Sequence, residues 1–431
     1  MKKSLSSQIF KMLTSDDGHK CADIPDAACK DQPKNFLKHV LSLSMTKTSD
    51  KLIDPKLILS WLLSTLGAPE LFIGLLVPVR EAGALLPQLF TSGYISSLSR
   101  RKWAWAIGSF LQGLCAIGIA TATLSLTGKT LGIVIVSILS LLALSRSICS
   151  VSYKDVLGKT VDTSNRGTAT GTASSIAAAL VIIYALIITS DIFNKMSLIV
   201  VGLFTAAVFW LLASGLFLTL TEEKSTVEEN KNPIKEVFAH FQRLLDDRQL
   251  QLFILTRGML TATALAPPFI VALSVEETKS MYGGLGLLIL ASSGASLCSS
   301  YIWGKLADRS SRKVLIYSGL AAAASLFATA ILAFYQLTAT PLVLPALLFS
   351  LMIAYQGVRL GRSTHLVDMT DETKRAAYTA LSNTIIGILL LAGSAFSLVA
   401  QFYGEIPVIT LFAVMCLLSV LTAYHLEEVQ Q

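Results

Sequence analysis

Long apolar runs, broken by short polar turns, dominate the sequence of 431 residues. A bilayer core is about 30 Å thick, so a helix needs about 20 residues to cross it. Runs of that length recur along the whole chain and predict an all-α membrane protein. The twelve predicted transmembrane helices lie at about residues 47–67, 71–97, 103–124, 131–156, 167–188, 197–220, 252–275, 282–306, 314–334, 341–360, 376–401 and 406–425.

One long polar interruption, residues 221–250, separates the first six predicted spans from the last six. Within it Asn232 and Pro233 form a good helix start, with Asn as the cap and Pro in the first helical position. Apolar residues then follow at helical spacing, which predicts an interfacial helix that links two membrane halves. The predicted organisation is a polar N-terminal extension, a six-helix half, this linker, a second six-helix half and a short tail, at residues 1–35, 36–220, 221–250, 251–425 and 426–431.

Charged residues leave the start of the first span open between two alternatives. The spacing of Lys47, Asp50, Lys51 and Asp54 puts all four on one helical stripe. In one alternative the stripe lies at membrane depth, where its two cations and two anions neutralise one another along a water-filled cavity. In the other, the helix begins near Leu52 and the stripe lies in the headgroup region or the cytosol. For Asp54 the cavity is the favoured position.

Composition agrees with a membrane protein, because only 15% of the residues are charged and 53% are hydrophobic. The formal charge of +7 includes no basic block, so no nucleic-acid partner is expected. The predicted outer turns hold only Lys129, Lys195 and Lys279, while the inner loops hold most of the Lys and Arg. This asymmetry predicts that both termini are cytoplasmic. No cleavable signal is visible, so we expect the first span to act as its own insertion signal.

The six cysteines predict neither a disulfide framework nor a metal site. Four of them lie in apolar runs, where Cys behaves as a small hydrophobic residue. Cys21 and Cys29 lie in the polar extension, and their spacing fits no usual zinc motif. We therefore expect two unpaired thiols there, and no cofactor or metal.

The most specific motif of the chain is the turn GKLADRSSRK at residues 304–313, between two apolar runs. Gly304 would let a helix end approach its neighbour closely. Asp308 could cap a helix or pair with an arginine. Three cations would anchor the turn on the cytoplasmic side. They are Arg309, Arg312 and Lys313. The turn resembles the G-x-L-a-D-r-x-x-r-K signature that follows the eighth helix of the major facilitator superfamily, where it acts in gating.

The resemblance covers about residues 36–425 and implies two parallel six-helix halves. Residues 93–102 align with 304–313 without gaps, but Ser97 stands where the acid would be, so this copy of the cytoplasmic latch would be weaker. Arg146 matches the family's arginine in the fourth helix, although Cys149 and Ser150 replace the Gln and Gly that follow it. A role of Arg146 in proton coupling is implied by the resemblance alone. The signatures of drug/proton antiporters, sugar porters and peptide porters are absent.

In such a fold, helices 1, 4, 7 and 10 line the central path, with 2, 5, 8 and 11 beside it. Arg80 and Arg146 could bind a carboxylate or phosphate by charge-assisted hydrogen bonds. Asp54 or Glu81, if poorly solvated, could carry a proton. The alternative for each residue is an interhelical ion pair that serves only packing. The candidates for substrate binding or coupling are Asp54, Lys56, Arg80, Glu81, Arg146, Arg257, Gln356, Arg359 and Asn383.

Together these features predict a secondary transporter, or permease, that moves a small solute by alternating access. We expect an anionic substrate, coupling to protons, and a monomer in the cytoplasmic (inner) membrane of a bacterium. The alternative is a non-transporting sensor or scaffold that keeps the fold, suggested by the polar extension and the degenerate first turn. No catalytic set or nucleotide-binding loop is recognisable in the sequence, so no enzyme activity is expected.

Overall fold

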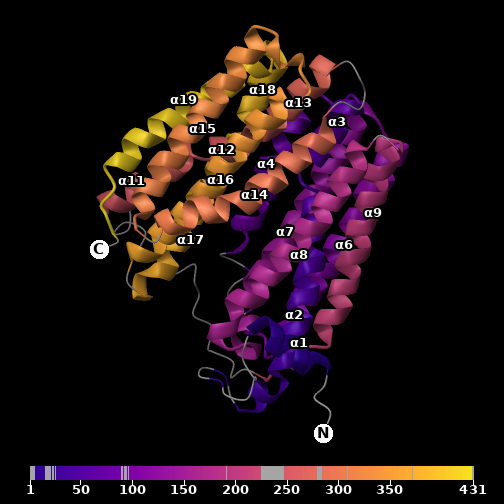
Figure 1. Cartoon of the computed structure of the whole chain (residues 1–431), viewed down its shortest axis with the longest axis vertical. Coiled ribbons are helices and arrows are strands. Elements are labelled where there is room, and N and C mark those ends of the chain that lie inside the picture. Colours follow the sequence, from indigo (N-terminus) through magenta and orange to yellow (C-terminus); the bar gives the residue numbers. More distant parts are fainter. Residues whose placement is uncertain are drawn as a thin grey trace.

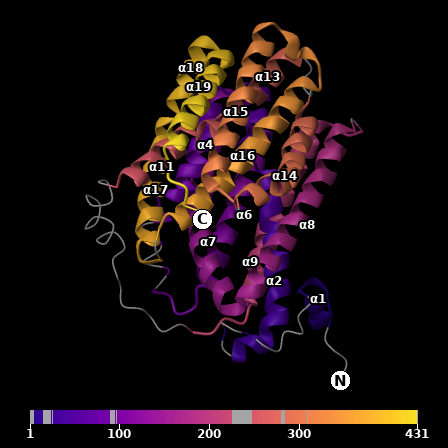
Figure 2. The same cartoon turned by 60° about the vertical axis from the view of Figure 1, so that its left-hand side comes forward.

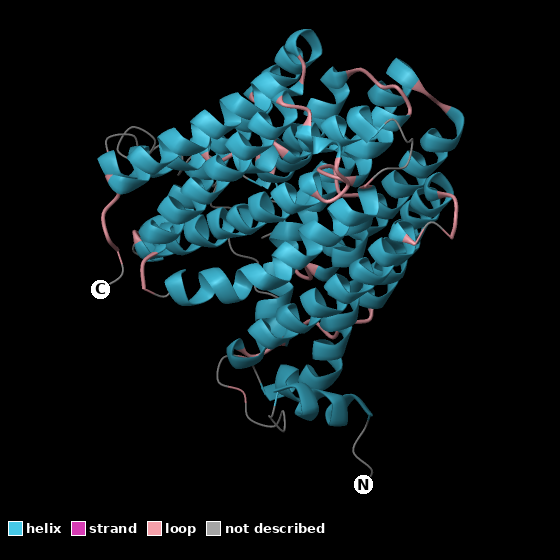
Figure 3. Cartoon of the chain, turned by 45° about the horizontal axis from the view of Figure 1, so that its top comes forward, coloured by secondary structure: helices cyan, strands magenta, loops and turns pink. Residues whose placement is uncertain are grey.

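The chain is helical in the computed structural model, which describes residues 5–14, 21, 24, 26–88, 91, 95, 97–190, 192–224, 247–278, 284–307, 309–370 and 372–429. No strand occurs in these ranges, as Figure 3 shows, so the all-α prediction is confirmed for them. Two predictions lie outside the described residues. They are the amphipathic helix of the linker, which would begin at residue 232, and the position of Asp308.

The helices form two groups along the chain (Figure 1). In the N-terminal group, α2 packs against α8 and α9, and α6 packs against α7 and α9. A short helix, α1 (Leu5–Thr14), precedes the group and packs on α2. The group consists of α2 (Asp26–Leu52), α3 (Ile58–Thr65), α4 (Glu70–Leu85), α6 (Lys102–Ser125), α7 (Gly128–Thr160), α8 (Thr163–Thr189) and α9 (Lys195–Leu218).

The C-terminal group begins at Arg248 and has the same kind of packing. Its helix α15 packs against α16 and α19, and α14 packs against α16. The group consists of α11 (Arg248–Met259), α12 (Ala262–Leu265), α13 (Pro267–Thr278), α14 (Leu285–Ala307), α15 (Ser311–Phe334), the 3-10 turn η1 (Leu337–Ala339), α16 (Val343–Asp368), α17 (Glu372–Ala392), α18 (Ala395–Tyr403) and α19 (Glu405–Tyr424).

Nine helices of the described chain are long and apolar enough to cross a membrane. The other three predicted spans correspond to α2 with α3, to α4 and to α14. Helix α2 is not among the nine because it is rich in polar residues, and α4 is not among them because it has only 16 residues. The seventh and eleventh spans are interrupted helices, α11–α12–α13 and α17–α18.

The first span differs most from its prediction. Helix α2 begins at Asp26, well before either predicted start, and the chain leaves the helix after Leu52. Pro55 lacks an N–H and disfavours helical geometry at the residue before it. The Lys56 N–H donates to Asp54 Oδ1 at 2.9 Å, and the Ile58 N–H donates to the Asp54 carbonyl at 3.0 Å. The local sequence Asp-Pro-Lys therefore ends one helix and starts the next.

The N-terminal segment before α2 is attached to the bundle. Phe10 of α1 is buried and packs edge-to-face on Phe36 of α2, with ring centroids 5.1 Å apart. Cys21 and Cys29 form a disulfide, with an S–S distance of 2.03 Å. The prediction of two unpaired thiols is therefore wrong, because the chain folds back and brings the two side chains together.

The two groups meet at one end of the molecule, the upper part of Figures 1 and 2, where α3, α13 and α18 lie. There α3 packs on α13, α4 packs on α18, and α8 packs on α14. Glycines allow these close crossings, since a Cβ on Gly74 would overlap Ser397. A Cβ on Gly286 would likewise overlap Thr189 and lie 3.1 Å from the carbonyl oxygen of Ala185. This end of the molecule is therefore closed by direct helix contact.

We expect Gly286→Leu to separate the two groups at this end, because its side chain cannot fit between α14 and α8. The measurement is an electron paramagnetic resonance distance between spin labels at Ile192 and Phe402, which are both exposed near the closed end. The distance should lengthen in the variant. Gly171→Leu is the control, because a Cβ at Gly171 meets nothing within 4 Å. An unchanged distance in Gly286→Leu would contradict a closure built on this crossing.

Candidate solute-binding site

A polar cavity of about 450 Å³ lies between the two groups of helices. Its wall combines residues of α2, α4, α7 and α8, and of the break after α2, with residues of α14 and α16. A cavity of this size suits a small molecule. Its charged lining residues are Lys47, Asp50, Lys51, Asp54, Lys56, Arg80, Glu81, Arg146, Arg359 and Arg362.

Asp50 is shared by two arginines. Arg80 Nη2 donates to Asp50 Oδ1 at 2.8 Å, and Arg146 Nη1 donates to Asp50 Oδ2. One carboxylate thereby links α2 to both α4 and α7. The Arg80 and Asp50 side chains are only 12% and 17% exposed. Screening by water is weak at such exposure, so each charge depends on its partner more than a surface ion pair would.

The break after α2 places Lys56 where the two groups of helices meet. Its Nζ lies 3.9 Å from Glu81 Oε1 of α4 and 3.6 Å from the ring centroid of Tyr355 of α16. The second distance is typical of a cation–π interaction. The Lys56 side chain is only 8% exposed, so this ammonium group lies at the deep end of the cavity. Lys56 therefore connects the N-terminal group to the C-terminal group directly.

The C-terminal wall of the cavity is formed largely by one face of α16. Gln356, Arg359 and Arg362 follow one another at a spacing of three residues and share this face. Gln356 Nε2 donates to Ser296 Oγ of α14 at 3.4 Å. Within the described chain, no carboxylate lies within ion-pair distance of Arg359 or Arg362. Arg359 is exposed to the open part of the cavity.

The structure brings seven of the nine predicted candidates together in the cavity wall: Asp54, Lys56, Arg80, Glu81, Arg146, Gln356 and Arg359. The other two lie outside this wall and bind each other. Arg257 of α11 donates to Asn383 Oδ1 at 2.8 Å and to Ser382 Oγ at 2.7 Å, both on α17. These bonds join two helices within the C-terminal group. The binding role of all nine residues stays a prediction.

Several cavity residues are absent from the predicted set. Lys47, Asp50 and Lys51 were left open because the depth of the first span was uncertain, although their stripe spacing pointed to the cavity. Arg362 is also in the wall, and its spacing of three residues from Arg359 is the signal that could have identified it. Lys47 Nζ donates to the Thr170 carbonyl at 3.2 Å and to the Ser174 hydroxyl, which brings α8 into the site.

The predicted gating turn is tied to the C-terminal tail. Ser310 caps α15 by accepting from the Lys313 N–H at 3.1 Å, and its hydroxyl donates to Glu428 Oε2 at 2.7 Å. Arg312 Nε lies 3.5 Å from the same carboxylate. The expected close approach at Gly304 is not observed, because a Cβ there would meet nothing within 4 Å. The gating role of the motif stays a prediction.

The first copy of this turn obtains its acid from a distant part of the sequence. Glu222, which follows α9, accepts from the N–H groups of Arg101 and Lys102, both at 2.9 Å, and so caps the start of α6. Lys159 Nζ lies 3.7 Å from the same carboxylate, whose side chain is fully buried. Asp155 of α7 forms a further ion pair with Arg101. Ser97 therefore does not leave this turn without an acidic partner.

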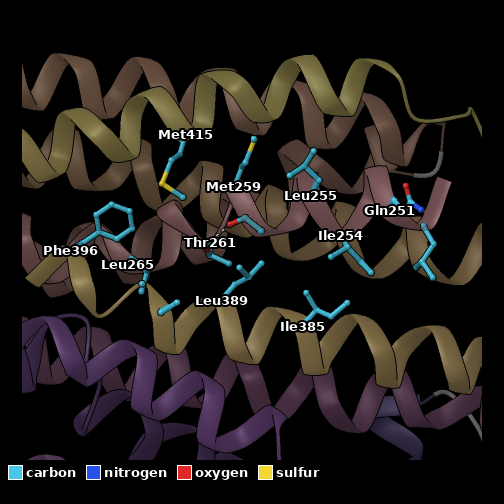
Figure 4. Close-up of a pocket in the computed structure, with 14 residues that line it drawn as sticks. Gln251, Ile254, Leu255, Met259, Thr261, Leu265, Ile385, Leu389, Phe396 and Met415 are labelled. Atoms are coloured by element: carbon cyan, nitrogen blue, oxygen red, sulfur yellow. Dashed lines mark hydrogen bonds between the residues drawn. The ribbon is translucent and has the colours of Figure 1, made fainter. Parts of the chain in front are cut away.

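A second cavity, of about 510 Å³, lies inside the C-terminal group (Figure 4). Its lining comes from α11, α17, α18 and α19 and is mainly aliphatic, aromatic and methionine side chains. Gln251 and Thr261 are the polar side chains among the residues that line it, and none of those residues is charged. Such a lining offers little to a polar solute. The charged cavity is therefore the better candidate site.

The charged cavity is suited to anions. Seven cations and three carboxylates line it, which gives its wall a formal charge of +4. Guanidinium and ammonium groups bind carboxylates and phosphates by charge-assisted hydrogen bonds. Ser174, Ser293 and Ser296 add hydroxyl groups to the same wall. No group of three or more His, Cys, Asp or Glu side chains that could hold a metal occurs in the described ranges.

No protein-family model matches the chain, and no curated protein matches it in sequence. Three solved structures resemble it over most of its length. A D-xylose–proton symporter has a TM-score of 0.68 and 14% identity, covering 92% of this chain and 98% of its own. The nucleoside transporter NupG has a TM-score of 0.67 and 15% identity, covering 91% of this chain and 98% of its own. A POT family transporter in complex with 5-aminolevulinic acid has a TM-score of 0.68 and 11% identity, covering 91% of this chain and 95% of its own.

At these identities the likeness concerns the fold. The chain has the twelve-helix fold of the major facilitator superfamily, in two halves of six helices, as the turn at 304–313 predicted. The substrates in those names belong to those proteins. The fold itself supports many different solutes, so the solute of this protein has to be inferred from its own cavity.

We expect Asp50→Asn to lower the stability of the protein, because it leaves the guanidinium group of Arg80, whose side chain is only 12% exposed, without its counter-charge. The loss should be about 1–3 kcal/mol, seen as a lower midpoint of thermal unfolding in detergent. Asp155→Asn is the matched control, since Asp155 also pairs with an arginine but is 40% exposed against 17% for Asp50, so water screens its charge more. An equal or larger effect of the control would show that Asp50 has no special structural role.

Proposed function

We propose that this protein is a secondary transporter that carries a small anionic solute across the membrane by alternating access. The observation that supports the proposal most strongly is the cavity between the two helix groups, whose wall carries a formal charge of +4. An anion bound there contacts both groups at once. Such a position, near the middle of the bundle and between two repeats, is typical of secondary transporters.

The arrangement of the two groups supports alternating access. At one end α3, α4 and α8 pack directly on α13, α18 and α14. Exposure points to an opening at the other end, because Arg359 of α16 is exposed whereas Lys56, which lies over Tyr355 one turn earlier on α16, is buried. We take this conformation as the one open to the side on which the N-terminal helix α1 lies. The distribution of Lys and Arg in the loops supports assigning that side to the cytoplasm.

Asp50 is our candidate for coupling to protons. It neutralises Arg80 and Arg146 in the empty cavity. An anionic solute that approaches these guanidinium groups competes with Asp50 for them. A proton on Asp50 removes that competition and frees both arginines. Binding of the proton and binding of the anion therefore favour each other, which is the linkage a proton symporter needs. Asp54 and Glu81 become less suited, since their partners are the Lys56 N–H and the Lys56 ammonium group, and neither acid holds Arg80 and Arg146.

We expect Arg80→Ala to abolish uptake of the solute while the protein still inserts into the membrane. A thermal-shift screen of wild type against anionic, neutral and cationic metabolites comes first, because a ligand at 100 times its dissociation constant stabilises by about 2.7 kcal/mol. Each hit is then tested for flux into proteoliposomes. Lys129→Gln is the control, since Lys129 is exposed in an outer turn and lies outside the cavity wall. Binding without flux would favour the sensor or scaffold.

Asp50→Asn should separate exchange from proton-driven accumulation. The neutral side chain mimics the protonated carboxyl and leaves the arginines free, so counterflow of labelled solute should persist. Accumulation driven by a pH gradient should fall to the level seen without the gradient. Lys129→Gln should behave as wild type in both assays. Accumulation at wild-type levels in Asp50→Asn would remove Asp50 from the coupling step.

A further inference from the structure

The interior of the C-terminal group contains cations but no acidic residue. No Asp or Glu occurs in residues 248–275, 284–307, 309–367 or 373–404. Arg257 lies in the last turn of α11, in the middle of the interrupted span, and Arg359 and Arg362 lie within α16. A cation at membrane depth is costly unless a polar partner or an anion accompanies it. Each of these arginines therefore needs a partner from elsewhere.

The three arginines differ in how that need is met. Arg257 is 7% exposed and has the Ser382 hydroxyl and the Asn383 amide oxygen as acceptors, at 2.7 and 2.8 Å. Among the described residues, Arg359 and Arg362 have no such acceptors, and both belong to the cavity wall. The ring centroid of Tyr355 lies 6.0 Å from Arg359 Cζ. Arg359 and Arg362 are thus available to a ligand.

The N-terminal wall of the cavity has more cations than carboxylates, so it cannot neutralise them. Asp50 already serves Arg80 and Arg146, and one oxygen of Asp54 accepts from the backbone of the helix break. Glu81 is the acid whose charged neighbours include Arg359 and Arg362. Its own ion-pair partner is Lys56, at 3.9 Å. A single shared carboxylate cannot neutralise three cations, so a positive excess remains on the C-terminal wall.

We infer that the transported solute carries at least two negative charges, and that Arg359 and Arg362 bind one of them. This inference rests on the function proposed above and narrows it. The other charge faces the cations of the N-terminal group, among them Arg80 and Arg146. The shared chemistry is that of a small organic dianion, either a dicarboxylate or a phosphate monoester. Gln356 and Ser296, beside Arg359, add an amide and a hydroxyl for its polar atoms.

A dianion also explains how binding could drive closure. In the open cavity, water solvates the exposed Arg359. When the two groups approach each other, that water is expelled and every uncompensated charge becomes more costly. A dianion neutralises both walls and holds them together, whereas a monoanion leaves one wall charged. Discrimination against monoanions should therefore arise at the C-terminal wall.

The test compares matched ligands by calorimetric titration of the full-length protein in nanodiscs, at fixed ionic strength. Succinate and glycerol 3-phosphate represent the two dianion classes, butyrate is the monoanion, and succinamide is neutral. At least one dianion should bind wild type at least about tenfold more tightly than butyrate. Arg359→Gln should remove that advantage and leave butyrate binding within about threefold. Lys129→Gln, in an outer turn, should change neither value.

The dianion class that binds identifies the anionic group. Equal affinity of wild type for dianions and butyrate, or an equal loss for both in Arg359→Gln, would overturn the inference. The function proposed above would survive that result if the protein transports butyrate or another monoanion into proteoliposomes. Absence of binding by both dianion classes would also overturn the inference. Tight dianion binding without flux would instead sustain the inference on the site and reject the transporter function.

Discussion

Two guanidinium groups share the single carboxylate of Asp50, and the electrostatics of the whole cavity follow from that shortage of negative charge. Arg80 of α4 and Arg146 of α7 both bind this carboxylate of α2, so the ion cluster also links three helices through their side chains. The N-terminal wall mixes both signs of charge, whereas the C-terminal wall contributes only cations. A bundle with this imbalance is incomplete by itself, because charges held away from water need counter-charges.

Most spans could be predicted from the sequence because a helix in a bilayer needs a long apolar run, and nine helices have one. The first span could not be placed this way. Its polar residues face an internal cavity and other helices rather than lipid, so hydropathy along the chain carries no signal for it. The break at Asp54-Pro55-Lys56 is visible in the sequence as a proline between charges, but the contact that it gives Lys56, with Tyr355 299 positions later, is not.

The position of a residue in the cavity wall was predictable where its charge falls near the middle of a predicted span, as for Arg80 and Arg146. It was not predictable where partners come from distant segments. Arg257 is held by Asn383 within its own group, and nothing local in the sequence distinguishes it from a cavity arginine. Glu222 is likewise 121 residues from Arg101, whose turn it completes. Pairings of this kind become visible only when the helices are assembled.

Glu222 has a mechanical consequence. It fastens the end of α9 to the start of α6, while Asn35 of α2 exchanges two hydrogen bonds of 3.1 Å with the Thr221 backbone beside it. Lys38 of α2 adds a third bond, to the Thr219 carbonyl at 2.5 Å. Hydrogen bonds therefore join the first and last helices of the N-terminal group, at the end of the molecule opposite the closed end. Such a group can tilt as one rigid body, and the contacts that change are then those with the other group.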